Sequence, residues 1–132
     1  MENKPYHLSV QIYYEDTDHS GVVYHANFLK YFERAREHVI GTDALAGLWK
    51  EKGLGFAVYK ADLMYSEGVE FGETIDIRST CTLDSEYRMI WTHEAWRKGG
   101  KKPAVSCTLH LVCLDKNKKL IQIPPILENQ SM

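Results

Sequence analysis

Hydrophobic and polar residues alternate near the start of the chain. The apolar positions of this stretch are Leu8, Val10, Ile12 and Tyr14. A period of two residues is typical of a strand with one buried face, because successive side chains point to opposite sides of a sheet. The pattern therefore predicts a strand that ends at Tyr14.

From Phe28 the spacing of apolar residues changes to three or four. The apolar positions are Phe28, Leu29, Tyr31, Phe32, Ala35, Val39 and Ile40. They cover roughly half the circumference of a helical wheel, which predicts a helix with other structure packed around it. Arg36 falls inside this apolar arc. We expect it to have an anionic partner, because an unpaired buried charge is costly.

The rest of the chain predicts one short helix and then a series of strands. The helix spans 44–52, with Thr42 or Asp43 as its N-cap and Gly53 as its end. Four strand-like segments follow, at 56–66, 73–84, 87–98 and 104–115. The links between them are short, which favours antiparallel neighbours.

This order of elements predicts an α+β fold, in which a curved antiparallel sheet surrounds one long helix. The 132 residues suffice for one hydrophobic core, so we expect a single domain over 1–132. Sheet edges left open by such a fold are often paired between subunits. A homodimer or homotetramer is therefore expected.

Composition excludes several classes of function. Sixteen basic and 18 acidic residues give a net charge of −2, which does not indicate nucleic-acid binding. The first residues lack the apolar core of a signal peptide, and no apolar run approaches the roughly 20 residues needed to span a bilayer. We therefore predict a cytoplasmic protein without a transmembrane segment. The cysteines, Cys81, Cys107 and Cys113, have no metal-ligand spacing and are expected to be reduced and buried in strands.

The segment between the first strand and the long helix carries the candidate chemistry. It reads YEDTDHSGVVYHANF from Tyr14 to Phe28. As a calcium loop it has oxygen ligands at alternating positions, but Asn27 stands where a bidentate glutamate is required. As a phosphatase-like motif with Asp16 as nucleophile, it would need a larger, repeatedly βα-wound domain. Both interpretations fit poorly, and Asp16 is better explained as a residue that accepts hydrogen bonds within the turn.

A longer pattern, YxDTDxxGVVYHxNFxxxxERAR, runs from Tyr14 to Arg36. It resembles the hotdog-fold thioesterases and, within them, the 4-hydroxybenzoyl-CoA thioesterase family. The greatest similarity is to the bacterial acyl-CoA thioesterase branch associated with the Tol-Pal system, which has histidine at position 25. The resemblance implies a hotdog fold and hydrolysis of an acyl-CoA thioester. Coenzyme A is then part of the substrate, and no separate cofactor or metal is implied.

The resemblance also implies roles for individual residues. Asp18 is the expected catalytic carboxylate, acting either as nucleophile or as general base. The backbone N–H of His25 is expected to stabilise the oxyanion, and its side chain to orient water or assist the leaving thiolate. Tyr14 is expected to position the carboxylate or the water. Asn27 is predicted to bind substrate, although a role as helix N-cap would also explain it.

The phosphates of coenzyme A require cationic side chains, and several basic residues lie near strand ends. They are Arg88, Arg97, Lys98, Lys101 and Lys102, with Arg88 the preferred candidate. Two other functions remain open. One is a non-hydrolytic module that binds acyl-CoA or acyl carrier protein; the other is a hotdog dehydratase, against which the aspartate of the loop argues. The sequence does not distinguish aliphatic from aroyl substrates.

Overall fold

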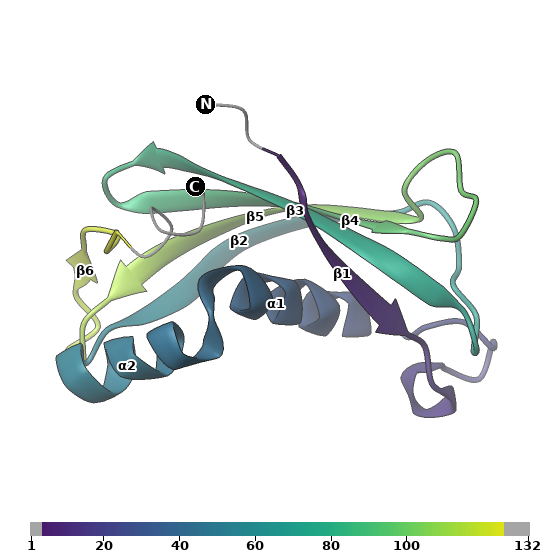
Figure 1. The fold of residues 1–132 in the computed structure, drawn as a ribbon, viewed down its shortest axis with the longest axis horizontal. Coiled ribbons are helices and arrows are strands. Elements are labelled where there is room, and N and C mark those ends of the chain that lie inside the picture. The colour runs from purple at the N-terminus through teal and green to yellow at the C-terminus, as the bar shows by residue number, and fades with distance from the viewer. Residues whose placement is uncertain (1–3, 126–132) are drawn as a thin grey trace.

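The computed structural model describes residues 4–125 and shows a sheet with a helical layer along one face (Figure 1). A 3₁₀ turn, η1 (Tyr14–Asp16), follows the first strand. The helices are α1 (Asn27–Ile40) and α2 (Thr42–Lys52). The strands are β1 (Tyr6–Gln11), β2 (Gly55–Tyr65), β3 (Thr74–Ser85), β4 (Arg88–Trp96), β5 (Val105–Leu114) and β6 (Leu120–Ile121).

The sheet is antiparallel, with the order β1-β3-β4-β5-β2 and with β6 paired to β5. The four long predicted strands are confirmed within about two residues at each end, because turn residues separate them as the sequence indicated. β1 and β2 form the two edges of the main path. β2 is the longer edge, at 11 residues, and its hydrogen-bonding groups on the side away from β5 have no strand partner in the described chain.

The helical layer consists of two consecutive helices. α1 buries the predicted apolar stripe against the sheet, including Phe32 and Val39. Gly41, with φ of 103°, separates α1 from α2 and occupies the N-cap position of α2. The prediction of Thr42 or Asp43 as this cap was wrong, since both lie within the helix. Gly53 ends α2 in the left-handed conformation at φ 66°, as predicted.

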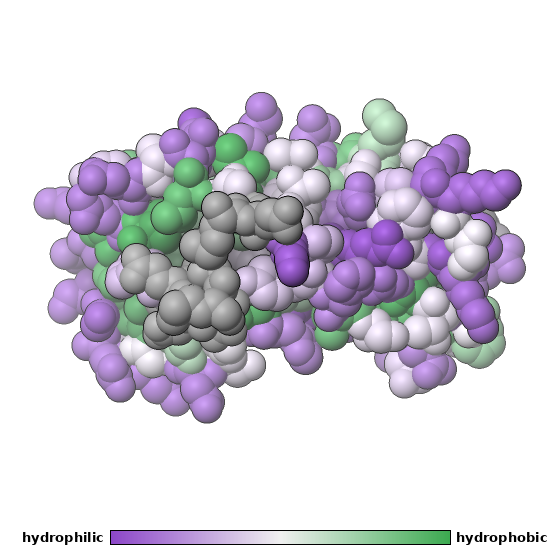
Figure 2. All heavy atoms as spheres, turned by 45° about the horizontal axis from the view of Figure 1, so that its top comes forward, coloured by the Kyte–Doolittle hydropathy of each residue, from purple (hydrophilic) through white to green (hydrophobic). Residues whose placement is uncertain are grey.

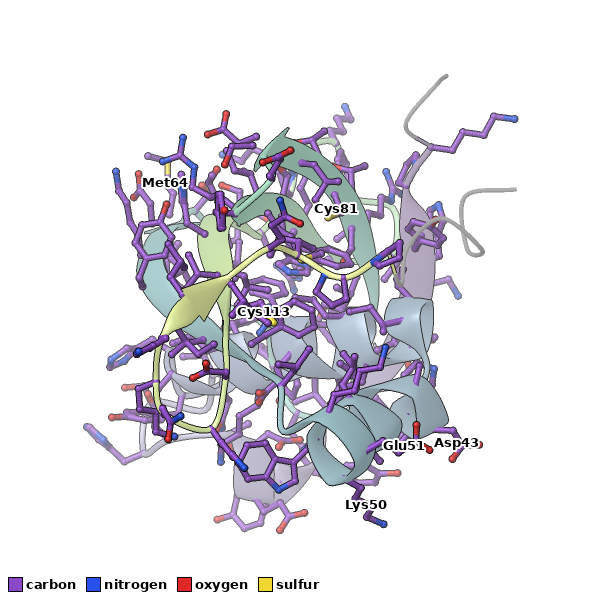
Figure 3. All side chains as sticks on the ribbon, turned by 90° about the vertical axis from the view of Figure 1, so that its left-hand side faces the viewer. Asp43, Lys50, Glu51, Met64, Cys81 and Cys113 are labelled. Atoms are coloured by element: carbon purple, nitrogen blue, oxygen red, sulfur yellow. The ribbon has the colours of Figure 1, made fainter. Side chains whose placement is uncertain are left out.

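The core lies between α1 and the inner face of the sheet. Its largest fully buried side chains include Trp91, Tyr31 and Phe32. Cys107 and Cys113 are also buried, Cys81 is half-buried, and none of the three forms a disulfide. In Figure 3, Cys113 points into the space between sheet and helices, whereas Asp43, Lys50 and Glu51 point away from the body.

Arg36 is buried in this core, with 7% of its surface exposed, but its expected anionic partner is not there. Within residues 4–125, no carboxylate lies within ion-pair distance of its guanidinium; instead, Nη1 donates to Nε2 of His93 at 3.1 Å. His93 Nδ1 lies 2.7 Å from the hydroxyl oxygen of Ser79. The prediction was therefore wrong about the charge of the partner. The guanidinium is held by a polar network that runs from α1 through β4 to β3.

The outer side of the sheet differs from the core. Figure 2 shows that hydrophilic residues dominate this face and that hydrophobic residues form separate patches on it. Burial alternates along β4, from Met89 and Trp91 on the inner face to Ile90 and Thr92 on the other. This one-sided burial is what an antiparallel sheet with one covered face requires.

Candidate functional site

Asp18 opens a tight turn between η1 and α1. Its backbone N–H donates to the carbonyl of Val22 at 2.9 Å, and Gly21 N–H donates back to the carbonyl of Asp18 at 3.0 Å. Gly21 has φ of 84°, a conformation that glycine adopts without strain. Asp18 is half-buried, and its Oδ1 accepts a hydrogen bond from Ser20 N–H at 2.8 Å. Its Oδ2 accepts none from the described residues, so one carboxylate oxygen remains available.

Asp16 has a structural position, as predicted. Its Oδ2 accepts from Tyr13 N–H at 2.7 Å, and its carbonyl accepts from Tyr24 N–H and from Asn27 Nδ2, each at 2.9 Å. These bonds connect η1 to the first residue of α1. Burial, and then the charge of Asp16, raise the pKa of Tyr31 above its ordinary value, which places this carboxylate close to the helix. Asp16 therefore stabilises the turn between η1 and α1.

Asn27 is not the N-cap of α1. It is the first helical residue, Ala26 occupies the cap position, and no side-chain cap bond is made there. One N–H of the Asn27 side-chain amide donates to the carbonyl of Asp16, which leaves its second N–H and its oxygen. Its role in binding substrate stays a prediction. What the structure does show is that Asn27 fixes the loop to the helix.

His25 lies at the N-terminal end of α1 with its ring exposed. Its carbonyl accepts a hydrogen bond from the hydroxyl of Tyr65, the last residue of β2, at 2.9 Å. Its ring lies between those of Tyr24 and Tyr65, with centroid distances of 4.6 Å and 6.0 Å. Its backbone N–H donates to no acceptor among residues 4–125. An N–H group without a partner, at the positive end of a helix dipole, is suited to binding an oxyanion.

Tyr14 does not end the first strand. β1 stops at Gln11, and Tyr14 begins η1 with 77% of its surface exposed. Its ring lies beside that of Phe71, at 5.9 Å between centroids. In the described chain its side chain makes no hydrogen bond to Asp18 or His25. The strand was predicted to end at Tyr14 because Ile12 and Tyr14 continue the alternation of apolar residues, although the chain already turns there.

Arg88 lies far from this loop. It begins β4 beside the β3–β4 turn, where it forms an ion pair with Asp84 and donates to the hydroxyl of Tyr59. β3, which is 12 residues long, runs about 35 Å from the end nearest the Asp18 loop to this turn. One chain therefore does not bring Arg88 and Asp18 together.

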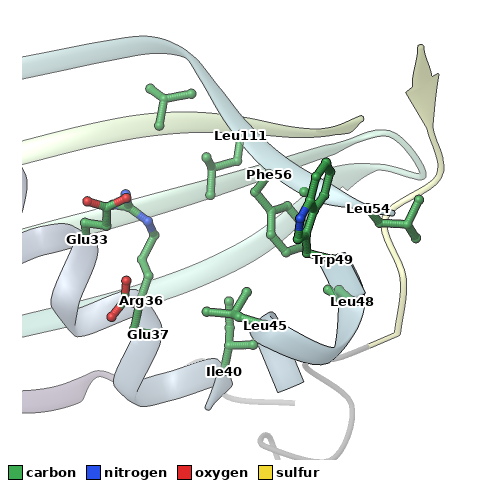
Figure 4. Close-up of a pocket in the computed structure, with 12 residues that line it drawn as sticks. Glu33, Arg36, Glu37, Ile40, Leu45, Leu48, Trp49, Leu54, Phe56 and Leu111 are labelled. Carbon is green, nitrogen blue, oxygen red and sulfur yellow. The ribbon is translucent and has the colours of Figure 1, made fainter. Parts of the chain in front are cut away.

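A separate cleft of about 310 Å³ lies between α1, α2, β2 and β5 (Figure 4). Its walls are mostly apolar and include Ile40, Leu45 and Phe56, with the indole of Trp49 at one side. Arg36, with Glu33 beside it in the close-up, lines the opposite end. Sequence patterns did not reveal this cleft, because its lining comes from four elements separated by up to 78 positions along the chain.

The described residues form neither a cluster of metal ligands nor a membrane-spanning helix. No group of three histidine, cysteine or acidic side chains within 4–125 is arranged to hold a metal ion. Over the same range, no helix is both long enough and apolar enough to cross a bilayer.

Comparison with protein families gives one decisive match. The model of the family described as "Thioesterase-like superfamily" matches residues 13–130. The chain belongs to the thioesterase-like superfamily. The matched range covers the Asp18 turn, both helices and all strands after them, so membership does not rest on the short motif alone.

Curated relatives carry related names. The "Acyl-CoA thioesterase YbgC" of Helicobacter pylori is 77% identical over 29 residues, which are 22% of each chain. The "Acyl-CoA thioester hydrolase YbgC" of Escherichia coli O6:H1 is 31% identical over 94 residues, which are 70% of this chain and 69% of the relative. The chain thus spans only about a fifth of the Helicobacter relative that it matches. The resemblance to a YbgC-like thioesterase is confirmed by the longer match.

Solved structures confirm the fold. Slr0204, a 1,4-dihydroxy-2-naphthoyl-CoA thioesterase from Synechocystis, superposes with a TM-score of 0.86 at 20% identity, over 96% of this chain and 94% of the other. The gentisyl-coenzyme A thioesterase BH1999 gives 0.81 at 18% identity, over 93% and 99%. With the curved antiparallel sheet and its helical layer, these likenesses confirm the predicted α+β hotdog fold. The prediction of a thioesterase-family enzyme is also confirmed at the level of the family.

Proposed function

We propose that this chain hydrolyses an acyl-CoA thioester to a free acid and coenzyme A, with Asp18 as nucleophile or general base. The observation that carries the proposal is the arrangement at the start of α1. There a half-buried carboxylate with one available oxygen precedes, by seven residues, a backbone N–H that has no acceptor among residues 4–125. Membership of the thioesterase-like superfamily and the YbgC names of relatives support the same reaction.

The proposed chemistry follows from these groups. Asp18 attacks the thioester carbonyl, or removes a proton from a water that attacks it, and the carbonyl oxygen becomes negatively charged. The His25 N–H and the helix dipole behind it stabilise this oxyanion. Collapse of the intermediate releases the thiolate of coenzyme A, which takes up a proton. On the general-base route this step leaves the free acid; on the nucleophilic route it leaves an acyl anhydride on Asp18, which water then hydrolyses to the free acid and the original carboxylate. Coenzyme A is part of the substrate here, and the scheme uses no separate cofactor.

We further propose that the working unit is a homo-oligomer joined through β2. This edge strand is long, its side away from β5 has no strand partner among residues 4–125, and it exposes Val58, Tyr59 and Met64 at 48%, 49% and 67%. An exposed apolar edge strand favours pairing with another chain. Antiparallel pairing of two β2 strands places the Tyr65 end of one beside the Gly55 end of the other.

This pairing has a consequence for the substrate. Tyr65 contacts the His25 loop, whereas Gly55 and Phe56 line the apolar cleft. Each Asp18 loop would therefore face the cleft of the partner subunit, which would receive the acyl group. The exposed aromatic rings around the loop, among them Tyr14 and Phe71, would be covered by partner or substrate.

The test is thiol release from a panel of short, medium, long and aromatic acyl-CoA esters, with Asp18→Asn as the variant. We expect turnover of at least one class, and a loss of at least about 1000-fold in Asp18→Asn, because asparagine can neither attack nor accept the proton. The melting temperature should stay within about 2 °C, since the turn retains its backbone bonds and an amide oxygen for Ser20.

Asp16→Asn is the matched control, because Asp16 lies two residues before Asp18 in the same loop. It keeps an oxygen for Tyr13 N–H and is expected to retain most of its turnover. Full activity of Asp18→Asn would contradict the assigned role. Binding of acyl-CoA by the native chain without any turnover would instead support a non-hydrolytic acyl-CoA or acyl-carrier-protein binding module.

A further inference from the structure

The turn between β4 and β5 concentrates positive charge. Arg97, Lys98, Lys101 and Lys102 fall within six positions of a chain whose net charge is −2. They line an open hollow of about 410 Å³, together with Glu67 and Glu73. The charge is therefore a local feature of this turn.

The two glutamates do not neutralise the whole cluster. Glu73 binds Arg97 through two hydrogen bonds, Nε to Oε1 at 2.8 Å and Nη2 to Oε2 at 3.0 Å. Glu67 approaches the same guanidinium at 3.9 Å. Lys98, Lys101 and Lys102 are exposed and form no ion pair with any residue from 4 to 125. Arg97 is thus committed to fixing the turn, and three ammonium groups remain for an external anion.

The turn lies at the same end of the molecule as the Asp18 loop (Figure 1). Two sets of hydrogen bonds connect them through the segment 66–73. On one side, Val23 N–H donates to the carbonyl of Val69 at 2.8 Å, and the same segment ends at Glu73, which holds Arg97. At the start of the segment, Ser66 N–H donates to the carbonyl of Ala104 at 2.8 Å. Ser66 directly follows Tyr65, whose hydroxyl donates to the carbonyl of His25. The position of the lysines is therefore fixed relative to the site.

We propose that Lys98, Lys101 and Lys102 bind the phosphate groups of the coenzyme A part of the substrate. This inference rests on the proposed thioesterase function. A lysine ammonium acts as a compact point charge with three donors, which suits a mobile phosphate at a solvent-exposed site. The thioester carbon is separated from the phosphates by the neutral pantetheine arm. A cationic turn beside the loop, but outside it, matches that separation of charge from the reacting bond.

The experiment compares the triple variant Lys98→Ala/Lys101→Ala/Lys102→Ala with native protein on two substrates that share one acyl group. One is the acyl-CoA, and the other is the acyl-pantetheine thioester, which lacks the phosphates. We expect kcat/KM for acyl-CoA to fall roughly tenfold at low salt, through KM, because three exposed charge pairs are lost. Turnover of acyl-pantetheine should stay unchanged.

The matched control is Lys98→Arg/Lys101→Arg/Lys102→Arg, which keeps three positive charges at the same exposed positions of the β4–β5 turn. It should leave both substrates unaffected. An equal loss on both substrates, or no loss on acyl-CoA, would overturn the phosphate assignment.

If the native chain turns over neither substrate, the proposed hydrolysis itself fails. The phosphate assignment is then decided by calorimetric titration of coenzyme A into native protein and both triple variants. Weaker binding in the alanine variant than in native protein and the arginine variant supports it, whereas native-like binding by the alanine variant overturns it.

Discussion

The loop before α1 and the core beneath that helix use polar side chains in opposite ways. In the loop, Asp16 and Asn27 bind backbone groups, while Asp18 keeps a carboxylate oxygen available and His25 is exposed. In the core, Arg36, His93 and Ser79 bind one another and are buried. Changes in the loop should therefore alter turnover, and changes in the core should alter stability.

The core network has a defined protonation state. Because Arg36 only donates, Nε2 of His93 must accept, and Nδ1–H then donates to the oxygen of Ser79. The imidazole lies parallel to the rings of Phe32 and Trp91, with interplanar angles of 3° and 4°. Burial first, and the charge of Arg36 second, lower the pKa of His93 to about 3. His93 is therefore neutral, and Arg36 is a buried cation with an uncharged partner.

The largest expected effect on stability comes from His93→Phe. Phenylalanine can occupy the space between the two rings, but it leaves the buried guanidinium and the Ser79 hydroxyl without their partner. We expect the free energy of unfolding to fall by about 3 kcal/mol, measured by urea denaturation at pH 7.

The control for this variant is His110→Phe, on β5, where the ring is half-buried and has a long 3.4 Å contact with the hydroxyl of Tyr59. It should change the free energy of unfolding by no more than about 0.5 kcal/mol. Equal stability of His93→Phe and native protein would show that His93 does not hold Arg36.

Acidification should reveal the same network with a smaller effect. A histidine with a lowered folded-state pKa contributes its full stability above its unfolded value of 6.5, and the contribution is lost as the pH falls toward 3. Only the unfolded chain binds the proton in this window, so stability decreases by about 1.4 kcal/mol per pH unit. Between pH 7 and pH 5 the loss at this residue is about 2 kcal/mol.

The measurement is urea unfolding of native protein and His93→Gln at both pH values. The variant lacks the titrating group but shares all others. Its stability deficit relative to native protein should therefore shrink by about 2 kcal/mol at pH 5. A deficit that is the same at both pH values would contradict the buried, neutral state of His93.

These two regions also differ in what the sequence could predict. Periodicity located the strands and helices because it records which side chains face the core, and it placed Arg36 correctly on the buried face. It could not identify His93 as the partner, because the two residues are 57 positions apart and meet only after α1 packs on β4. The electrostatic expectation of a carboxylate was reasonable for an isolated charge, but the direct partner is the neutral His93, and the charges of Glu33 and Glu37 act on Arg36 only from beyond ion-pair distance.

In the loop, the motif located the candidate residues and misjudged their surroundings. Tyr14 was assigned to a strand because alternation alone does not detect the bond from Tyr13 N–H to Asp16 that turns the chain. Arg88 was preferred for phosphate binding; within one chain the length of β3 separates it from Asp18, and the preference stays a prediction. The lysines of the β4–β5 turn were only some of several basic candidates until hydrogen bonds through 66–73 connected them to the site. Residues that are neighbours only across strands could therefore be identified only from the structure.

The smallest effect is expected for His25→Ala, which tests whether a change in the loop alters turnover without altering stability. The proposed oxyanion donor is the backbone N–H, which alanine retains, and the exposed ring lies near the rings of Tyr24 and Tyr65. We expect kcat to fall less than tenfold, with unfolding unchanged within about 0.5 kcal/mol. His25→Pro, which removes the N–H itself, should cost far more turnover, and a circular dichroism spectrum would verify that α1 is retained. If alanine were as damaging as proline in folded protein, the imidazole rather than the backbone would be the group that acts on the substrate.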